Sequence, residues 1–307
     1  MDISALFAAL PGNVAQGIIW GIMALGVFFT FRILDFADLT VDGSFATGGA
    51  VAAMLITGGY SVPVALIAAT VSGVAAGIVT GLLHTKLGIP GILASILTQI
   101  SLYSINLNIM KGMANVAING NKYNLIVSLR YIPQAILISA IFAVVIIIAA
   151  YWYFGTEQGS AVRATGSNPN MSQAQGININ AMKVLTLGIS NGVVALAGGL
   201  IAQYQGFADI NMGRGAIVIG LAAVIIGEVV GHAIFGKRMN FMIKMVCVVC
   251  GGVIYYIVIG IVLWLRMPTN NLKLFTAIIV AIFLAVPYLK GKANNSFRKA
   301  AKRGGSN

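Results

Sequence analysis

Charged residues are scarce in this 307-residue chain and make up 8% of it. Soluble domains carry about 25% charged residues, so this chain has too few to cover a water-facing globule. Two cysteines exclude a disulfide scaffold, and glycines without a three-residue period exclude a collagen-like chain. Because 59% of the residues are hydrophobic and the mean hydropathy is +0.93, we expect the lipid bilayer to surround the protein.

Acidic residues are the rarest class, with 7 Asp and Glu against 19 Lys and Arg, which gives a net charge of +12. In a soluble protein this excess would suggest nucleic acid as a partner. Here the C-terminal residues 290–307 hold six of the basic residues, so the excess is concentrated in a tail rather than on a folded face. Basic residues of this kind mark the cytoplasmic ends of membrane spans, and we expect no nucleic-acid partner.

Apolar stretches recur along the whole chain, and they predict an all-α polytopic membrane protein with about nine segments, each of about 20 residues and long enough to cross a hydrocarbon core of about 30 Å. The predicted segments are 13–31, 40–57, 62–83, 92–110, 133–154, 182–204, 214–231, 241–264 and 272–289. The basic tail predicts a cytoplasmic C-terminus, and an odd number of crossings then places the N-terminus outside.

The segments predict one transmembrane domain over residues 1–289, followed by the basic cytoplasmic tail over 290–307. The domain has halves at about 13–154 and 182–289, joined by a polar cytoplasmic loop over 155–181. Two short runs in this loop are compatible with helix and are separated by Gly and Pro, which predicts a compact helical elbow. A flexible linker is the alternative, although irregular polar segments of this length are often functional.

An internal repeat relates the two halves. Aligned without gaps at an offset of 171, residues 17–52 match residues 188–223 at ten positions, including Phe-Ala-Asp at 36–38 and at 207–209. In the predicted topology the two copies cross the membrane in opposite directions, which makes an inverted-repeat bundle. Inverted repeats are typical of transporters, so the repeat favours a transporter over a channel or a membrane enzyme.

Polar residues near the start of the second predicted span are candidates for the chemistry of transport. Charged groups at membrane depth are costly and are often functional. We therefore expect Asp38, Asp42, Ser44 and Thr47, with the matched Asp209, to line the translocation path or its gate in a broken helix. The alternative is an ordinary solvated loop on the inner face.

No group of residues has the spacing of a catalytic or metal site. The two histidines have no Ser or Cys partner at a recognisable spacing, and Cys247 and Cys250 lie in an apolar helix without a second ligand pair. The Gly-x4-Gly-Lys motif at 231–237 lacks the following Ser or Thr that would bind magnesium. We expect no catalytic residue, no metal and no cofactor, so the energy for active transport must come from a partner.

Three ordered blocks resemble permeases of ABC importers of the branched-chain amino acid and ribose type. The first is RILDFADLTVDGSF with GGA over 32–50, the second is the polar stretch over 159–178, and the third covers 197–228. The segment DFADLTVDGSFATG over 35–48 is most similar to that of tryptophan-type, tyrosine-type and uncharacterised uptake systems. The resemblance implies a type II-like ABC importer permease fold.

The resemblance also implies partners and a location. These are a second permease copy in a homodimer, a cytoplasmic ABC ATPase dimer and an extracytoplasmic solute-binding protein, assembled in a bacterial cytoplasmic membrane. The implied cargo is a small solute, an amino acid and in particular an aromatic one, with nucleosides and sugars as alternatives. The residues implied to couple transport to the ATPase are Gly159, Arg163, Ala164, Gly166, Asn168, Met171 and Gly176. The rival interpretation is a self-sufficient secondary transporter or a channel, which would need no such loop.

Overall fold

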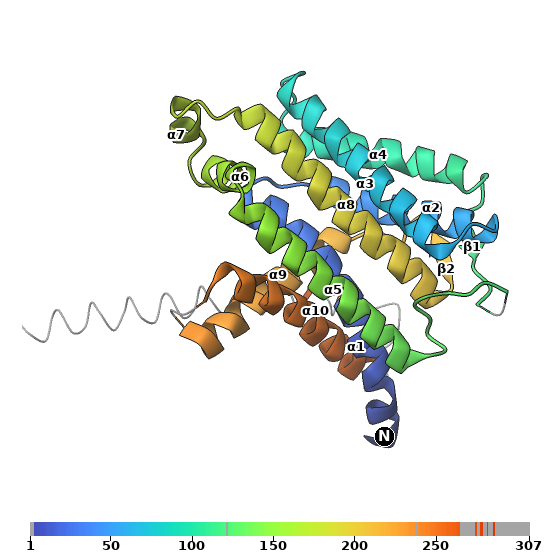
Figure 1. Ribbon diagram of the computed structural model, residues 1–307. Coiled ribbons are helices and arrows are strands. Elements are labelled where there is room, and N and C mark those ends of the chain that lie inside the picture. Colours follow the sequence, from blue (N-terminus) through green and yellow to red (C-terminus); the bar gives the residue numbers. More distant parts are fainter. Residues whose placement is uncertain are drawn as a thin grey trace, which may run out of the picture.

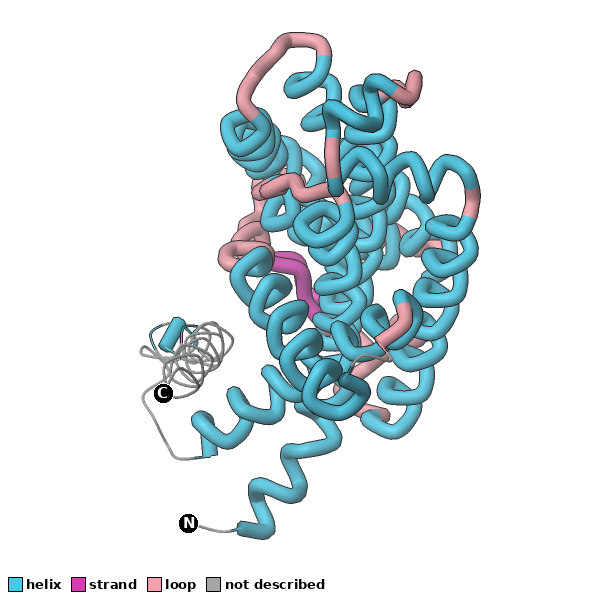
Figure 2. The backbone as a smooth tube through the Cα atoms, turned by 90° about the vertical axis from the view of Figure 1, so that its left-hand side faces the viewer, coloured by secondary structure: helices cyan, strands magenta, loops and turns pink. Residues whose placement is uncertain are grey.

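The computed structural model describes residues 3–120, 122–236 and 239–264, with a few single positions between 274 and 285. Most of these residues are helical, and two short strands lie among the helices (Figures 1 and 2). In chain order the elements are α1 (Ile3–Phe28), η1 (Phe29–Ile33), α2 (Thr40–Thr57), α3 (Val62–Thr85), α4 (Gly91–Ile109), β1 (Asn115–Ala117), α5 (Ile132–Gly155), α6 (Glu157–Ser167), α7 (Pro169–Ala174), α8 (Ile179–Gln205), β2 (Phe207–Asp209), α9 (Ala216–Phe235) and α10 (Phe241–Trp264).

Seven of the described helices are long and apolar enough to cross a membrane. They are α1 with η1, α3, α4, α5, α8, α9 and α10. The predicted segment 40–57 coincides with α2, which is not among these seven and is almost wholly buried. The predicted segment 272–289 and the tail over 290–307 lie outside the described residues. The chain is therefore a helical, multi-pass membrane protein, and the count of nine crossings stays a prediction.

The helices line up between two ends of a bundle. At one end, called here the α6 end, α5 runs into α6 and α7, and α8 begins (Figure 1). The side chain of Lys183 in α8 contacts His84 near the end of α3 at this end, with 3.1 Å between Nζ and Nε2. At the opposite end, called the β1 end, α4 leads into β1, and β1 pairs antiparallel with β2 after α8. The polar loop is thus helical, as predicted for residues 155–181.

The first helices of the two matched segments, α1 and α8, run antiparallel through the middle of the bundle. Ser190 in α8 donates a hydrogen bond to the carbonyl of Gly26 in α1 over 2.7 Å. Farther along, Tyr204 in α8 donates to the carbonyl of Gly12 over 2.9 Å. The partner in α1 moves toward the N-terminus as α8 advances, so the two copies of the repeat point in opposite directions.

The two copies of the repeat begin two units of three long helices, α1 to α3 and α8 to α10. The first helix of each unit packs against the third helix of the other. Gly17 in α1 lies so close to α10 that a Cβ there would be 2.7 Å from the Cα of Val253. The matched Gly188 in α8 faces α3, where a Cβ would be 3.2 Å from the side chain of Ile78. Because α2 packs on α3 and α9 packs on α10, the two units exchange their first helices symmetrically.

Helices α2 and α8 cross at very short range. A Cβ on Gly198 in α8 would overlap the carbonyl oxygen of Phe45 in α2, so the crossing requires glycine there. The ring of Phe45 lies 4.8 Å from that of Trp20 in α1, measured between centroids. Close approach through small residues is the usual way in which membrane helices associate. The contact holds α2 at the centre of the bundle.

We expect Gly198→Ala to destabilise the protein by about 1–3 kcal/mol, because the added methyl group must displace the backbone of α2. Gly155→Ala is the matched control, since a Cβ at Gly155 meets nothing within 4 Å. The measurement is the midpoint of thermal unfolding of the purified protein in detergent. Equal midpoints for the two variants would contradict the close crossing.

Candidate functional site

The chain leaves its helices at two matched positions. After α1 and η1, Asp35 adopts a left-handed conformation with φ +56°, and after α8, Gly206 does so with φ +78°. These positions differ by the same offset of 171 that relates the two copies of the repeat. Glycine adopts this conformation at little cost, and Asp is among the few other residues that tolerate it. Each copy of the repeat therefore has a helix that breaks and a non-helical segment that leads to the next helix.

The repeated aspartates make the same local hydrogen bond. The backbone N–H of Thr40 donates to Asp38 Oδ1 over 2.9 Å, and the N–H of Asn211 donates to Asp209 Oδ1 over 2.7 Å. Their surroundings differ, because Asp38 is 2% exposed whereas Asp209 is half-buried in β2. Asp209 lies at the β1 end, where the side-chain amide of Asn115 donates to its Oδ2 over 3.5 Å. The motif Phe-Ala-Asp thus lies in both breaks, but only the first of the two aspartates is fully buried.

Asp38 is held inside the bundle by Asn191 of α8. The side-chain amide of Asn191 donates to Asp38 Oδ2 over 2.7 Å, and Asn191 Oδ1 accepts a hydrogen bond from Ser44 over 2.6 Å. Asn191 lies about 18 Å along α8 from Ile179 at a rise of 1.5 Å per residue, so Asp38 is at membrane depth. Buried polar groups need hydrogen-bond partners. The amide of Asn191, in the second copy of the repeat, is the partner of Asp38 and Ser44 in the first copy.

Asp42 joins the first turns of α2 and α9. Its two carboxylate oxygens accept hydrogen bonds from the backbone N–H groups of Gly215 and Ile217, over 2.9 and 2.8 Å. The N-terminus of a helix carries unpaired N–H groups and a partial positive charge, so a carboxylate stabilises it. Gly213 lies against the backbone of Asp42 at the same junction. The Asp42 carboxylate therefore caps a helix of the opposite copy of the repeat.

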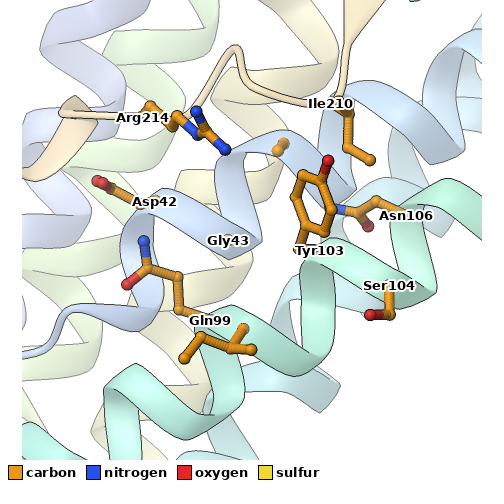
Figure 3. A pocket seen from close by; sticks show the side chains of 10 residues that line it. Asp42, Gly43, Gln99, Tyr103, Ser104, Asn106, Ile210 and Arg214 are labelled. Atoms are coloured by element: carbon orange, nitrogen blue, oxygen red, sulfur yellow. The ribbon is translucent and has the colours of Figure 1, made fainter. Parts of the chain in front are cut away.

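A polar pocket lies beside this junction. It has a volume of about 290 Å³ and opens to the surface between α2, α4 and the loop before α9. Figure 3 shows Arg214 extending from the loop toward the space between Asp42 and Tyr103. The residues that line it are Asp42, Gly43, Ala46, Gln99, Ile100, Tyr103, Ser104, Asn106, Ile210 and Arg214.

The structure separates the residues predicted for the translocation path. Asp42 lines the pocket, whereas Ser44 and Thr47 are buried at helix contacts, with Thr47 donating to the carbonyl of Gly43 over 2.9 Å. The alternative of a solvated loop fits Asp35, which is exposed, and is wrong for Asp38, which is buried in the bundle.

The residues predicted for coupling lie on α6, α7 and the turns beside them. Gly159 and Gly166 are packing positions, because a Cβ on either would overlap backbone atoms of α5 or of Ile33 in η1. The Asn168 side chain caps α7 by accepting from the N–H of Met171 over 3.0 Å. The exposed members of the set are Arg163, Asn168, Met171 and Gly176, while Ala164 is half-buried.

An ion pair connects the two copies near the α6 end. Arg32 in η1 donates to Glu228 in α9 with 2.7 Å between Nε and Oε1. Their side chains are 58% and 17% exposed, so the pair borders on solvent. From Glu228 back to Ala216, α9 extends about 18 Å into the bundle. The helix therefore starts deep in the bundle, at Asp42, and ends near the α6 end.

Several functional candidates escaped the sequence analysis. Asn191, which holds Asp38, is one of few polar residues in an apolar span. Three further candidates lie on α4, and their polar side chains were a signal that this helix lines a functional site: Gln99, Tyr103 and Asn106. Arg214 was likewise not among the residues predicted for the translocation path. Among residues 3–264 that the structure describes, no three His, Cys, Asp or Glu side chains are grouped so that they could hold a metal ion.

Comparisons with known proteins point to transport. A family model described as "Branched-chain amino acid transport system / permease component" matches residues 12–287. A tyrosine transport system permease protein of Clostridioides difficile strain R20291 is 38% identical over 93% of this chain and 92% of its own length. An uncharacterized protein of Rickettsia prowazekii is 34% identical over 88% of this chain and 94% of its own length.

A more distant relative is the galactofuranose transporter permease protein YtfT of Escherichia coli K12. It is 27% identical over 68% of this chain and 60% of its own length. No solved structure matches the chain.

Replacing Asn191 by Leu should lower the free energy of unfolding by about 3 kcal/mol, because the buried Asp38 carboxylate loses a donor. Ser44→Ala removes one neutral hydrogen bond and should cost about 1 kcal/mol. Ser101→Ala, which removes an exposed hydroxyl on α4, is the control and should change little. Thermal unfolding in detergent ranks the three variants. If Asn191→Leu were as stable as Ser101→Ala, the Asn191 amide would not be holding Asp38.

Proposed function

Since this chain belongs to the family of branched-chain amino acid transport permease components of ABC importers, we propose that it forms the membrane path for an amino acid. The observation that carries the proposal is the match of the permease family over residues 12–287, nearly the whole length of the chain. The family is one of transport components rather than catalytic subunits. We infer that ATP hydrolysis belongs to separate subunits.

The arrangement of the helices supports alternating access. Two oppositely directed units exchange their first helices, and each contains a helix break, one at Asp35 and one at Gly206. We assign the inverted halves to about 13–154 and 182–289. In transporters, rocking of such units about a central site opens the path to one side and then to the other. The segment from Asp38, in the first break, to Asp42, in the first turn of α2, would be the fixed point of this movement.

The short helices α6 and α7 are suited to receive the movement of an ATPase. Gly159 and Gly166 seat α6 against α5 and η1, so a push on α6 reaches the end of α1 directly. Arg163 and Met171 remain exposed, and Met171 is 55% exposed. We propose that these exposed residues dock on a cytoplasmic ABC ATPase dimer, and that this contact makes residues 155–181 the coupling loop.

We place the α6 end in the cytoplasm of a bacterium, with the chain in the cytoplasmic membrane. Arg32, Lys86, Arg163 and Lys183 belong to this end, in agreement with the preference of cytoplasmic loops for basic residues. The C-terminus would then be cytoplasmic and the N-terminus outside. The β1 end, with the loop from 110 to 131, would receive an extracytoplasmic solute-binding protein.

A second copy of the chain completes the path in this proposal. The polar pocket beside Asp42 opens on the outer surface of one bundle. Polar side chains facing lipid at membrane depth are costly, so this face needs a polar neighbour. A homodimer whose two pockets face a shared path meets that need.

The proposed cargo is an amino acid with an aromatic side chain. The relative from Clostridioides difficile is named as a tyrosine transport permease and is 38% identical over 93% of this chain. The more distant Escherichia coli relative is named for galactofuranose at 27% identity, and this makes a sugar the alternative cargo.

We expect ATP-driven uptake of L-tyrosine in vesicles that contain this chain, its ATPase and loaded binding protein. In the same vesicles Arg163→Glu should reduce the initial rate at least about tenfold, because reversing an exposed charge weakens docking of the ATPase. The fold should persist, since exposed substitutions usually change stability by less than about 0.5 kcal/mol. Scintillation counting of labelled tyrosine and co-purification of the ATPase measure the two effects.

Lys86→Glu is the matched control, because it makes the same charge reversal at the same end of the bundle but outside α6 and α7. Its uptake should stay within about twofold of the unchanged protein. Uptake by the chain alone, without ATPase or ATP, would contradict the importer and favour a secondary transporter or channel. Normal uptake by Arg163→Glu would contradict only the docking site.

A further inference from the structure

The pocket between α2, α4 and the loop before α9 contains polar groups that the rest of the fold does not use. Gln99 lies about 12 Å along α4 from Gly91, so the pocket begins near the middle of this helix and extends toward the β1 end. Its volume of about 290 Å³ is at the lower limit of small-molecule sites, which run from about 300 Å³ upward. Its size therefore suits a small solute.

Arg214 brings a positive charge to this pocket. No salt bridge or side-chain hydrogen bond joins its guanidinium to any other residue that the structure describes. Asp42 is the acidic residue of the pocket, but its oxygens are already bonded to the N–H groups of Gly215 and Ile217. The carboxylate is held at the start of α9 and makes no ion pair with Arg214, so the guanidinium is left for another partner. An arginine binds carboxylates with two parallel hydrogen bonds.

The side chain of Asn106 carries a hydrogen-bond acceptor that no donor among the described residues uses. Its side chain is 1% exposed, and its Oδ1 accepts no hydrogen bond from any described residue. A buried acceptor left unpaired costs about 1–3 kcal/mol, so such a group at a binding pocket calls for a donor from outside the chain. In Figure 3, Asn106 lies beside Tyr103, on the far side of the pocket from Asp42.

The ring of Tyr103 supplies an apolar surface between the two polar groups. Its side chain is 43% exposed and faces the pocket beside Asn106 (Figure 3). Aromatic rings pair favourably in offset or edge-to-face arrangements. A solute that satisfies the whole pocket has a carboxylate for Arg214, an N–H donor for Asn106 and a flat apolar group for Tyr103. An aromatic α-amino acid combines these three features in one small molecule.

We propose that this pocket is a solute-binding site in which Arg214 binds the carboxylate and Asn106 accepts from the ammonium of an aromatic amino acid. The assignment rests on the proposed function, because it supposes that an amino acid enters the membrane path. It adds the residues that recognise the cargo within the permease. A sugar lacks both the carboxylate and the ammonium, so its hydroxyls would form only neutral hydrogen bonds with Asn106 and would leave the positive charge of Arg214 without a counterion.

The test uses the complete importer in vesicles, with L-tyrosine as the probe and saturating binding protein. Arg214→Gln should lower the maximal uptake rate at least about tenfold, equivalent to about 1.4 kcal/mol, without changing the concentration of loaded binding protein that gives half-maximal uptake. Arg214→Lys should recover part of the rate, because it restores the charge without the paired hydrogen bonds. Asn106→Leu, similar in size and without the acceptor, should lower the rate in the same way.

Lys86→Gln is the control, since it removes an exposed cation at the α6 end, away from the pocket. Its uptake should stay within about twofold of the unchanged protein. Normal uptake by Arg214→Gln would overturn the assignment. Dissociation of the complex in this variant would also overturn it, because Arg214 would then be a subunit contact. The assignment would also be overturned if the unchanged protein, in vesicles without anionic lipid, lost as much uptake as Arg214→Gln does. The partner of Arg214 would then be a lipid headgroup. A failure of the proposed function is distinct, since the unchanged complex would then take up no tyrosine.

Discussion

The hydrogen bonds of Asp38 and Asp42 make the two helix breaks compatible with a membrane. Backbone N–H groups at membrane depth have no water to bond with, so a non-helical segment there must find partners in the protein. The segment after Asp35 ends on Asp38, which bonds the N–H of Thr40. Farther on, Asp42 bonds the N–H groups of Gly215 and Ile217 at the start of α9. The Asp42 carboxylate, in the first copy of the repeat, thereby pairs backbone N–H groups of the second copy.

Close glycine contacts bring these carboxylates to their partners. Gly198 lets the backbone of α8 approach α2, and about two turns earlier Asn191 reaches Asp38 and Ser44 from the same helix. The exchange of first helices between the two units rests on Gly17 and Gly188 in the same manner. Packing and polar contacts therefore depend on one another: larger residues at the crossings would separate the carboxylates from the groups that satisfy them.

The apolar spans and the repeat were predictable from sequence, because length and hydrophobicity fix the spans and the offset of 171 matches both the glycines and the aspartates. The helical elbow over 155–181 followed from its short runs between Gly and Pro. What sequence could not supply were contacts between distant segments. Nothing near Asp38 indicates that its partner is Asn191, 153 positions away, or that Arg32 pairs with Glu228. The pocket was missed for the same reason, since α2, α4 and the loop at Arg214 meet only in the folded bundle.

The central claim is that the Asp42 carboxylate holds the start of α9, and hydrogen–deuterium exchange of the Gly215 and Ile217 amides tests it most directly. In the unchanged protein these two amides should exchange slowly, because both donate to Asp42. In Asp42→Ala they should exchange at least about tenfold faster, while amides in the middle of α8 keep their protection. Equal exchange at Gly215 and Ile217 in the two proteins would contradict the account.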